Sequence, residues 1–521
     1  MAVDVDVAIV GYGPCGAVAV GLLGGMGVRT WACDKSTTIY DKPRAFALDH
    51  EIMRVFQQLG IHEQVLAHSE PFTPSEFHGV DGQLIKRFTT VEPPFPLAFP
   101  PSLVFNQPAT EQVLRDHVAT LPNVQVALGC ELVALSQDGD RVRLQARAAD
   151  GTMTEINARY VIACDGASST VRGLVDIALQ DLGFDEPWLV VDVMINDAGM
   201  RKLPRVSMQY CEPQRPCTYL VGPGRHRRWE IAINDGEDAR QVATPQGTWQ
   251  LLSRWITPDD ATLWRQASYR FHALVAERWR AGRVFVAGDA AHQQPPFLGQ
   301  GMCQGIRDVA NLGWKLHAVL HGHAPDALLD SYGAERKAHV RNLTTRIKGI
   351  GRIVGERDLA AARARDAQLL AECGGVVPSV PRQDVQPALE TGLLSPERRS
   401  GVGSIFPQPW LSSGATRVRM DEVCGRQWRV VLADGADHAL AQVARAYPSM
   451  HVIPIGDERH QDADGVAARW FTRHGCAAAI VRPDHYVYGV SDTREQLSTQ
   501  LQALQTIMYP KGDTHATTPC S

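Results

Sequence analysis

Near the N-terminus the sequence reads Val5-Asp6-Val7-Ala8-Ile9-Val10-Gly11-Tyr12-Gly13-Pro14-Cys15-Gly16, an apolar strand that runs into three glycines. An Ala/Val/Leu-rich helix follows, and a second strand, 28–33, ends at Asp34. In a dinucleotide fingerprint, Gly11 forms the tight turn, Gly13 lets the backbone approach a pyrophosphate, and Gly16 packs helix on strand. Asp34 is placed to bind the ribose hydroxyls of an adenosine half. The order predicts a Rossmann-like dinucleotide-binding domain.

A second segment, 284–317, joins an apolar strand to the turn Gly288-Asp289, a Pro/Gly loop and a helix whose apolar stripe covers 305–320. Asp289 can accept hydrogen bonds from sugar-like hydroxyls, and Gly299 and Gly301 carry no Cβ, so backbone N–H groups can approach a ring closely. The helix N-terminus favours an electron-rich ligand edge. The alternative interpretation is an ordinary connection between a strand and a helix.

A third segment, 160–172, repeats the order of strand, Asp165-Gly166 turn, small polar residues and then Arg172. Taken alone, it is typical of an ordinary Asp-Gly turn. In this order and at these separations, the three segments resemble the FAD-dependent aromatic hydroxylases, single-component flavoprotein monooxygenases with the p-hydroxybenzoate hydroxylase fold. The resemblance covers residues 3 to about 341 and includes Pro43-Arg44-Ala45 and Gln107-Pro108.

Four further segments resemble the 3-(3-hydroxyphenyl)propionate and resorcinol-type hydroxylases within that group. They are Gln209-Tyr210-Cys211-Glu212-Pro213, Arg227-Arg228-Trp229-Glu230, Phe406-Pro407-Gln408-Pro409 and Val481-Arg482-Pro483-Asp484. One departure is the run Ile231-Ala232-Ile233-Asn234-Asp235-Gly236-Glu237, where the resemblance leads us to expect a Pro-Gly-Glu turn. This departure leaves open a substrate pocket that differs from those relatives.

The resemblance implies a set of residues that bind FAD. Arg44 and Gln107 are expected at the ribityl-pyrophosphate region, and Pro296 is expected against the isoalloxazine ring. Asp165 and Arg172 are associated with both FAD and the nicotinamide cofactor. The full expected set is Gly11, Gly13, Pro14, Cys15, Gly16, Asp34, Lys35, Arg44, Gln107, Asp165, Arg172, Asp289, Pro296, Gly299, Gly301 and Met302. The co-substrate is NADH or NADPH, since the sequence does not distinguish them.

The implied activity is hydroxylation of a phenolic substrate with dioxygen through a flavin C4a-hydroperoxide, in the catabolism of aromatic compounds. A 3-(3-hydroxyphenyl)propionate-like or resorcinol-like substrate is expected. Alternatives are a larger polycyclic phenol of secondary metabolism, or another FAD-dependent oxidoreductase such as a halogenase or a reductase. The Trp-x-Trp-x-Ile segment of halogenases is missing from the sequence, and the run Gly288-Asp289-Ala290-Ala291-His292-Gln293-Gln294-Pro295-Pro296 favours hydroxylation.

Phenols have a pKa of about 10, as Tyr does, so a nearby base or positive field assists their reaction at neutral pH. The catalytic candidates are His50, His292, Tyr210, Tyr219 and Arg228. Each histidine has a structural alternative, a packing role at a helix start for His50 and a fixed hydrogen bond for His292. Strand alternation allows only one of Arg228 and Trp229 to face the pocket, and core packing is expected of Trp229.

Composition agrees with an enzyme of several domains. The chain has 521 residues, of which 44% are hydrophobic and 21% are charged. Its formal net charge of -5 does not favour binding to nucleic acid or to an anionic membrane. Eleven cysteines without a CxxC pair favour reduced thiols and a cytoplasmic protein. The 18 histidines form no HExxH motif, so no metal site is expected. A homodimer is left open.

The expected fold class is α/β, with the FAD-binding domain interleaved with a β-sheet substrate domain. The FAD-binding pieces are 1–75, 102–180 and 268–370, and the substrate-binding pieces are 76–101 and 181–267. A linker at 371–404 leads to a thioredoxin-like C-terminal domain at 405–510, whose Cys424 and Cys476 lack redox spacing. A disordered tail is expected at 511–521.

Overall fold

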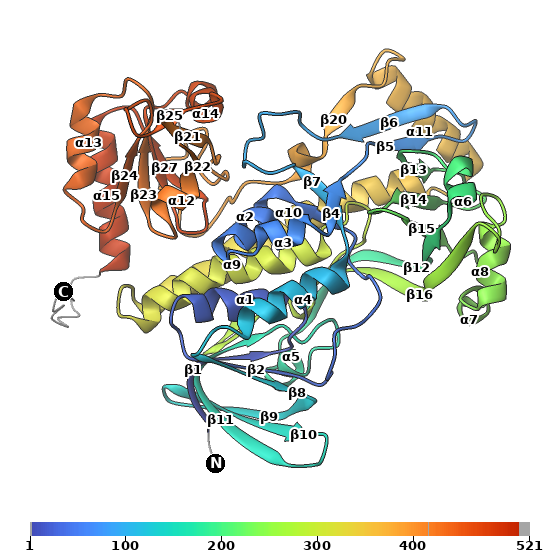
Figure 1. Ribbon diagram of the computed structural model, residues 1–521, viewed down its shortest axis with the longest axis horizontal. Coiled ribbons are helices and arrows are strands. Elements are labelled where there is room, and N and C mark those ends of the chain that lie inside the picture. Colours follow the sequence, from blue (N-terminus) through green and yellow to red (C-terminus); the bar gives the residue numbers. More distant parts are fainter. Residues whose placement is uncertain (1–2, 415, 510–521) are drawn as a thin grey trace.

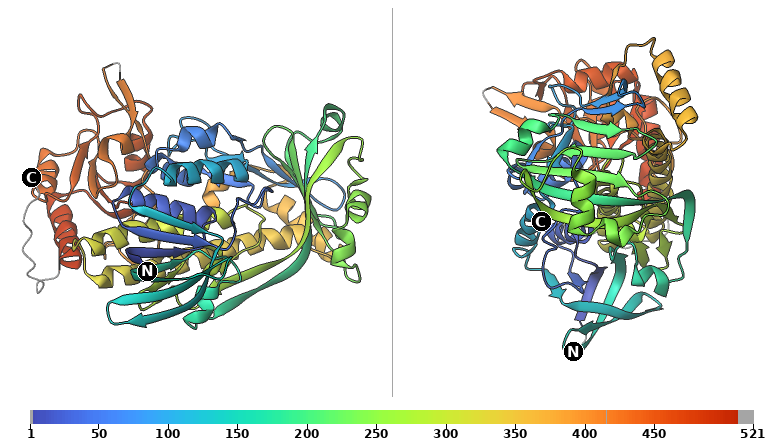
Figure 2. Two further views of the ribbon diagram at one scale, coloured as in Figure 1. Left: turned by 60° about the horizontal axis from the view of Figure 1, so that its bottom comes forward. Right: turned by 90° about the vertical axis from the view of Figure 1, so that its right-hand side faces the viewer.

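The computed structural model describes residues 3–414 and 416–509 of a mixed α/β protein (Figure 1). Its long axis has the C-terminal part at one end and a large, mostly antiparallel sheet at the other, with a sheet that has a parallel centre and long helices between them (Figures 1 and 2). The expected tail at 511–521 lies outside the described residues.

The first sheet has the order β17-β18-β11-β1-β2-β8. The neighbours from β18 to β8 are parallel, and β9 and β10 extend the sheet antiparallel from β11. Its strands are β1 (Val3–Val10), β2 (Thr30–Asp34), β8 (Val124–Leu128), β9 (Cys130–Asp138), β10 (Arg141–Ala148), β11 (Met153–Ala163), β17 (Arg280–Ala281) and β18 (Val284–Val286). Residues Val7, Ala8, Ile9 and Val10 are almost fully buried, as expected for a parallel strand covered on both faces.

Register places the carboxyl ends of four strands at one edge of this sheet. Val10 pairs with both Cys33 and Ala163, and Ala163 pairs with Val286. The three segments singled out in the sequence therefore begin side by side, although they are far apart along the chain. Such an edge is where α/β sheets bind their ligands.

Helices cover this sheet and lead from it toward the other parts of the molecule (Figure 1). Helix α1 packs against both α4 and α9, and α10 packs against α9. The helices are α1 (Pro14–Gly25), α2 (His50–Gln58), α3 (His62–Leu66), α4 (Gln107–Val118), α5 (Thr170–Leu174), α9 (Gly301–Leu320), α10 (Asp330–Gly355) and α11 (Leu359–Glu372). A small sheet of β3 (Ala47–Asp49), β7 (Ser102–Phe105) and β4 (Ser69–Pro71) lies beside α2 and α3.

The second sheet has nine strands in the order β19-β16-β12-β15-β14-β13-β5-β6-β20. Their bounds are β5 (Ser75–His78), β6 (Leu84–Thr89), β12 (Leu179–Ile195), β13 (Ser207–Tyr210), β14 (Cys217–Val221), β15 (His226–Ala232), β16 (Ala261–Ala276), β19 (His292–Gln293) and β20 (Ser379–Pro381). Short helices α6 (Asp197–Lys202), α7 (Ala239–Val242) and α8 (Pro245–Leu252) accompany it. Strand β16 continues past residue 267, and β20 comes from the segment expected to be a linker.

The C-terminal part has a four-stranded sheet in the order β24-β23-β26-β27, where β23 is parallel to β24 and antiparallel to β26. Its elements are β21 (Trp410–Ser413), β22 (Thr416–Arg419), α12 (Met420–Cys424), β23 (Arg429–Leu432), α13 (His438–Arg445), β24 (His451–Pro454), β25 (Gln461–Asp462), α14 (Val466–His474), β26 (Ala478–Val481), β27 (Val487–Ser491) and α15 (Arg494–Met508).

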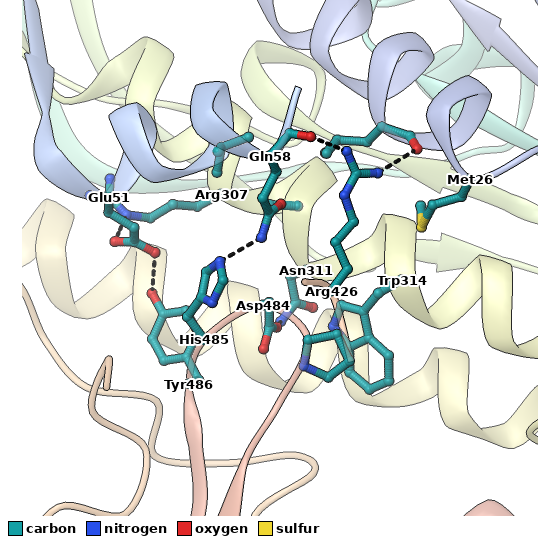
Figure 3. A pocket seen from close by; sticks show the side chains of 14 residues that line it. Met26, Glu51, Gln58, Arg307, Asn311, Trp314, Arg426, Asp484, His485 and Tyr486 are labelled. Atoms are coloured by element: carbon teal, nitrogen blue, oxygen red, sulfur yellow. Dashed lines mark hydrogen bonds and ion pairs between the residues drawn. The ribbon is translucent and has the colours of Figure 1, made fainter. Parts of the chain in front are cut away.

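The turn between β26 and β27 joins this part to α2 and α9 (Figure 3). The Tyr486 hydroxyl donates to Glu51 Oε1 over 2.9 Å, and Asn311 Nδ2 donates to Asp484 Oδ2 over 3.0 Å. A pocket of about 30 Å³ remains between these groups, which is room for a water molecule rather than a substrate.

Candidate functional site

A cavity of about 790 Å³ lies between the carboxyl edge of the first sheet and one face of the second. This volume is in the range of cofactor and substrate sites. One half is lined by the ends of β1, β2, β11 and β18 and by the start of α9, and we call it the strand-end half. The other half is lined by β12 to β16 and is called the sheet half.

The first glycine turn shows which glycines the protein itself requires. A Cβ on Gly11, at φ +95°, would lie 2.3 Å from the Cys164 carbonyl oxygen, and one on Gly16 would lie 2.0 Å from the Gly11 oxygen. A Cβ on Gly13 would meet no protein atom within 4 Å. Gly13 therefore borders open space at the start of α1, as a pyrophosphate site requires.

Two hydrogen-bonded residues shape the neighbouring wall. Asp34 accepts hydrogen bonds from the backbone of Tyr12 and Ser36, each over 2.8 Å. Gln107 Oε1 accepts from the backbone N–H groups of Arg44, over 2.9 Å, and Ala45, over 2.5 Å. Gln107 thus holds the backbone that presents Arg44, whose side chain is exposed and lines the cavity.

The Gly288–Ala290 turn leaves the Asp289 side chain exposed to the cavity, without a hydrogen-bond partner among the described residues. The pKa of Asp289 is raised above its ordinary value, because desolvation, together with the nearby Asp308, outweighs the opposing effect of His292 and Arg44. Behind the turn, Asp308 accepts from Gly288 N over 3.0 Å and from Arg336 Nε over 2.9 Å. Asp308 therefore fixes the turn from the protein interior, while the Asp289 side chain faces the cavity.

The loop before α9 completes the strand-end half. Gly299 has φ +63°, which disfavours a side chain, and a Cβ on Gly301 would meet no protein atom within 4 Å. Pro296 and Met302 also line the cavity. Free N–H groups at the start of the 20-residue helix α9 give this wall a partial positive charge. These features fit the electron-rich edge of an isoalloxazine ring.

Fourteen of the sixteen residues expected at the cofactor line the cavity, and Gly16 and Arg172 do not. Gly16 packs under Gly11, which is the structural role the fingerprint gives it. The Arg172 guanidinium donates to the carbonyls of Ala290 and Ala167, over 3.0 and 2.9 Å. The Asp165 carboxylate accepts from Ser169 Oγ over 2.5 Å, so it organises its own turn.

Alternation along β15 divides its side chains between two environments. Trp229 is fully buried and packs with Tyr219 and Trp255. Arg228 lines the cavity and contacts Asp192 on β12 through Nε–Oδ1 at 2.7 Å and Nη2–Oδ2 at 3.1 Å. Arg228 also donates to the carbonyls of Arg44 and Pro43. It therefore ties the second sheet to the segment that presents Arg44.

The other four catalytic candidates do not line the cavity. His292 is 1% exposed, pairs through Nε2 with Asp308 at 2.7 Å and stacks on Trp279, which matches its structural alternative. His50 begins α2, and burial lowers its pKa to about 4, so its ring is neutral at physiological pH. Tyr219 donates to the Pro204 carbonyl, and Tyr210 packs on Trp255; both side chains belong to the face of the sheet that α7 and α8 cover.

The sequence reasoning missed several polar residues that line the sheet half: Gln209, Thr218, Glu230, Arg265, Tyr269 and Arg382. Glu230 could have been predicted from the sequence, because residues two apart on a strand face the same side and Arg228 was already a candidate for the pocket. Arg382 comes from the expected linker, and its guanidinium carbon lies 4.1 Å from the centre of the Phe72 ring. No local pattern marked it.

Other classes of site are not found in the described part of the chain. Within residues 3–414 and 416–509, no group of three or more His, Cys, Asp or Glu side chains is arranged to hold a metal ion. Among the described helices, none combines the length and apolar character that a membrane crossing requires. The ten described cysteines are free, including Cys15 and Cys164, whose sulfur atoms lie 3.7 Å apart at the cavity wall.

Two family models match the chain. Residues 4–347 match a family described as an FAD binding domain, and residues 403–506 match one described as the HcaD C-terminal domain. The first match covers more than half of the chain and includes the strand-end half of the cavity.

Curated relatives cover nearly the full length. The chain is 36% identical over 518 residues to a probable NADH-specific resorcinol 4-hydroxylase of Rhodococcus jostii (strain RHA1), covering 97% of this chain and 96% of the relative. It is 31% identical over 544 residues to a 3-(3-hydroxy-phenyl)propionate/3-hydroxycinnamic acid hydroxylase of Mycobacterium sp. (strain JLS), covering 98% and 94%.

Solved structures share the fold at lower sequence identity. The flavin-dependent monooxygenase PieE, in complex with FAD and substrate, superposes with a TM-score of 0.82 at 22% identity, over 97% of this chain and 99% of that one. Aklavinone-11 hydroxylase, with FAD and aklavinone, gives a TM-score of 0.79 at 22% identity, over 97% and 98%.

Proposed function

Because this chain belongs to the FAD-dependent aromatic hydroxylases, we propose that it uses NADH and dioxygen to hydroxylate a small phenol with a substituent at position 3. The substituent is a second hydroxyl, as in resorcinol, or a carboxyalkyl chain, as in 3-(3-hydroxyphenyl)propionate. Support for NADH comes from the name of the Rhodococcus relative, and support for the substrate comes from both relatives.

The observation that carries this proposal is the continuity of the cavity. The strand-end half fits FAD, since Gly13 and Gly301 border open space and the exposed Asp289 side chain has no hydrogen-bond partner among the described residues. The sheet half opens from the same volume, so a phenol held there would lie next to the half that would hold FAD. When bound, FAD supplies the redox chemistry that activates dioxygen with electrons from NADH.

The side chains of this protein have three tasks in that reaction. The first task is to hold the cofactor, and it falls to Arg44, Asp34 and Asp289. Phe72, Phe297 and Leu298 line the cavity with apolar surface and exclude water from the reacting atoms. Polar side chains that line the sheet half orient the phenol, and Arg228 and Arg265 supply the positive field that favours its anionic form.

The C-terminal part is proposed to be a thioredoxin-like domain without redox activity. Its four-stranded sheet and the accompanying helices follow the order β23-α13-β24-α14-β26-β27-α15, with β25 of a separate small sheet between β24 and α14. Strands β23 and β24 are parallel, and β26 and β27 are antiparallel. Cys424 and Cys476 are both buried, and burial raises the pKa of each thiol, so neither is suited to thiolate chemistry. We propose that this part serves in packing or in forming a homodimer. A cytoplasmic location is proposed for the whole protein.

The test is a panel of phenols offered to the FAD-loaded protein. Resorcinol or 3-(3-hydroxyphenyl)propionate is expected to accelerate NADH oxidation and to yield a product with one additional oxygen atom, identified by mass spectrometry. NADPH is the matched control and should be oxidised more slowly. If no phenol accelerates NADH oxidation or gives a hydroxylated product, the proposed substrate class is wrong.

A further inference from the structure

Glu230, on β15, is a buried carboxylate at the cavity. It is 4% exposed, it lines the sheet half, and its side chain has no hydrogen-bond partner among the described residues. Asp192, one strand away, differs because it pairs with Arg228 and with His226 Nε2 at 2.7 Å. A carboxylate removed from water without a partner is costly, unless a ligand supplies the missing hydrogen bond.

Register places Glu230 in a polar row that crosses three strands. Gln209 on β13 pairs with Thr218 on β14, and Thr218 pairs with Glu230 on β15. The Thr218 hydroxyl donates to Gln209 Oε1 over 2.5 Å, which leaves the Gln209 amide Nε2 as a donor at the cavity. Neighbouring strands are about 4.8 Å apart, so Gln209 and Glu230, on either side of β14, are separated by about 10 Å at the backbone, and a ligand that contacts both lies over Thr218. A phenol hydroxyl can donate to Glu230, and a second polar group of the ligand can accept from Gln209.

The surrounding charges suit a proton acceptor. Burial is the largest influence on Glu230 and, together with Asp192, raises its pKa to about 7, whereas Arg228 and Arg265 lower it. The other titratable or charged side chains that line the sheet half are Tyr269, Arg270 and His272 on β16 and Arg382 from the segment after β20. Val190 and Thr218, which pair with Glu230 from the two adjacent strands, do not titrate, and neither does Gln209 on the strand beyond Thr218. Glu230 is thus half ionised near neutral pH, where a general base is most effective.

We propose that Glu230 is a catalytic residue that accepts the hydrogen bond of a ring hydroxyl of the substrate and takes its proton as the ring is hydroxylated. The O–H bond breaks, its electron pair stays on the phenol oxygen, and the proton joins a carboxylate oxygen of Glu230. Negative charge passes from Glu230 to the substrate, where it remains near Arg228 and Arg265 and makes the ring more nucleophilic. The proton returns to the product hydroxyl. This inference rests on the proposed function.

A carboxylate at this position also restricts the substrate. A hydroxyl edge of the ring is accepted there, whereas a substrate carboxylate would meet a like charge. A 3-carboxyalkyl chain must therefore point away from Glu230, and a second hydroxyl need not.

The experiment compares wild-type holoenzyme, Glu230→Gln and, as a matched control, Glu186→Gln. Glu186 is a half-buried carboxyl of the same sheet with a raised pKa, bonded to Trp188 Nε1 and outside the cavity lining. We expect Glu230→Gln to keep its FAD content and Tm while kcat/KM for resorcinol falls about 10²-fold, mainly in kcat. Glu186→Gln should match wild type.

Ligand binding to the oxidised holoenzyme, followed by flavin absorbance, gives a second measurement. A hydroxyl that donates to Glu230 requires the ionised carboxylate, so wild-type affinity for resorcinol should rise with pH through about 7. Affinity for 1,3-dimethoxybenzene, which has no hydroxyl to donate, should not change. This comparison needs only wild-type protein, so it decides the inference even if Glu230→Gln does not fold.

The inference is overturned if Glu230→Gln retains kcat/KM within about threefold of wild type. It is equally overturned if both ligands show the same pH dependence. If wild type itself is not stimulated by any phenol, the proposed function fails first, and this inference fails with it.

Discussion

Arg482, which follows β26, and Glu335 of α10 form two parallel hydrogen bonds, Nη1–Oε1 at 3.0 Å and Nη2–Oε2 at 2.7 Å, with both side chains fully buried. Asp484 also pairs with Arg482, and Lys315 of α9 pairs with Glu335, each at 2.7 Å. Two carboxylates and two cations therefore balance one another where the C-terminal part meets the long helices. A buried pair of this kind is costly to break from one side.

Replacement of Arg482 by alanine should lower the free energy of unfolding by about 3–5 kcal/mol, because it leaves two carboxylates facing one lysine in a dry interface. Urea unfolding of the FAD-loaded protein measures the loss. Arg494→Ala is the control, since Arg494 pairs with Glu495 on the surface and should cost less than about 1 kcal/mol. Equal losses of unfolding free energy for both variants would show that the buried ion pairs stabilise the protein no more than a surface pair does.

The same network predicts a pH dependence. Burial raises the pKa of Glu335, but Arg482 and Lys315 outweigh it and lower the value to about 2. Because the folded pKa lies below the ordinary value of 4.5, the stabilisation is present above that value and is lost as pH falls toward 2. Urea unfolding between about pH 3 and 6 should show a steeper slope for wild type than for Glu335→Gln. Parallel slopes would contradict the assignment.

Gly13 and Gly16 should respond differently to alanine. Gly13 has φ -74° and no protein atom near its missing Cβ, so Gly13→Ala should fold normally but lose FAD affinity by at least about tenfold. Gly16→Ala places a Cβ against the Gly11 carbonyl and should destabilise the fold itself, by about 1–3 kcal/mol. Tm of the apoprotein and FAD titration separate the two effects. Normal FAD affinity in Gly13→Ala would show that the pyrophosphate does not bind at this turn.

Asp289→Ala tests the other half of the cofactor site. Since the Asp289 carboxylate has no hydrogen-bond partner among the described residues, the apoprotein should keep its stability within about 0.5 kcal/mol. Loss of a charged hydrogen bond should weaken FAD binding by about 10- to 100-fold, measured by fluorescence titration. Asp289→Asn, which keeps an acceptor oxygen, should lose less. FAD retention equal to wild type in Asp289→Ala would show that this aspartate does not hold the cofactor.

Local patterns predicted the strand-end half well because its requirements are local. Gly11, Asp34 and Asp289 each follow an apolar strand, and the positions of such strand ends are set by backbone geometry that any parallel sheet repeats. The histidines were harder to interpret, because a ring beside a glycine turn can serve the turn or the substrate. His292 faces Asp308, sixteen residues later, and only packing decides between those roles.

The sequence by itself determined the strand, glycine turn, helix and acidic strand end of the dinucleotide site, and its resemblance to the hydroxylases implied the flavin chemistry. The dinucleotide turn depends on residues within about one strand and one helix of one another. The tertiary structure alone decided which side chains meet the substrate: Gln209, Glu230 and Arg382 come from separate strands and from a segment expected to be a linker. Their convergence follows from sheet register and long-range packing, which no local pattern encodes.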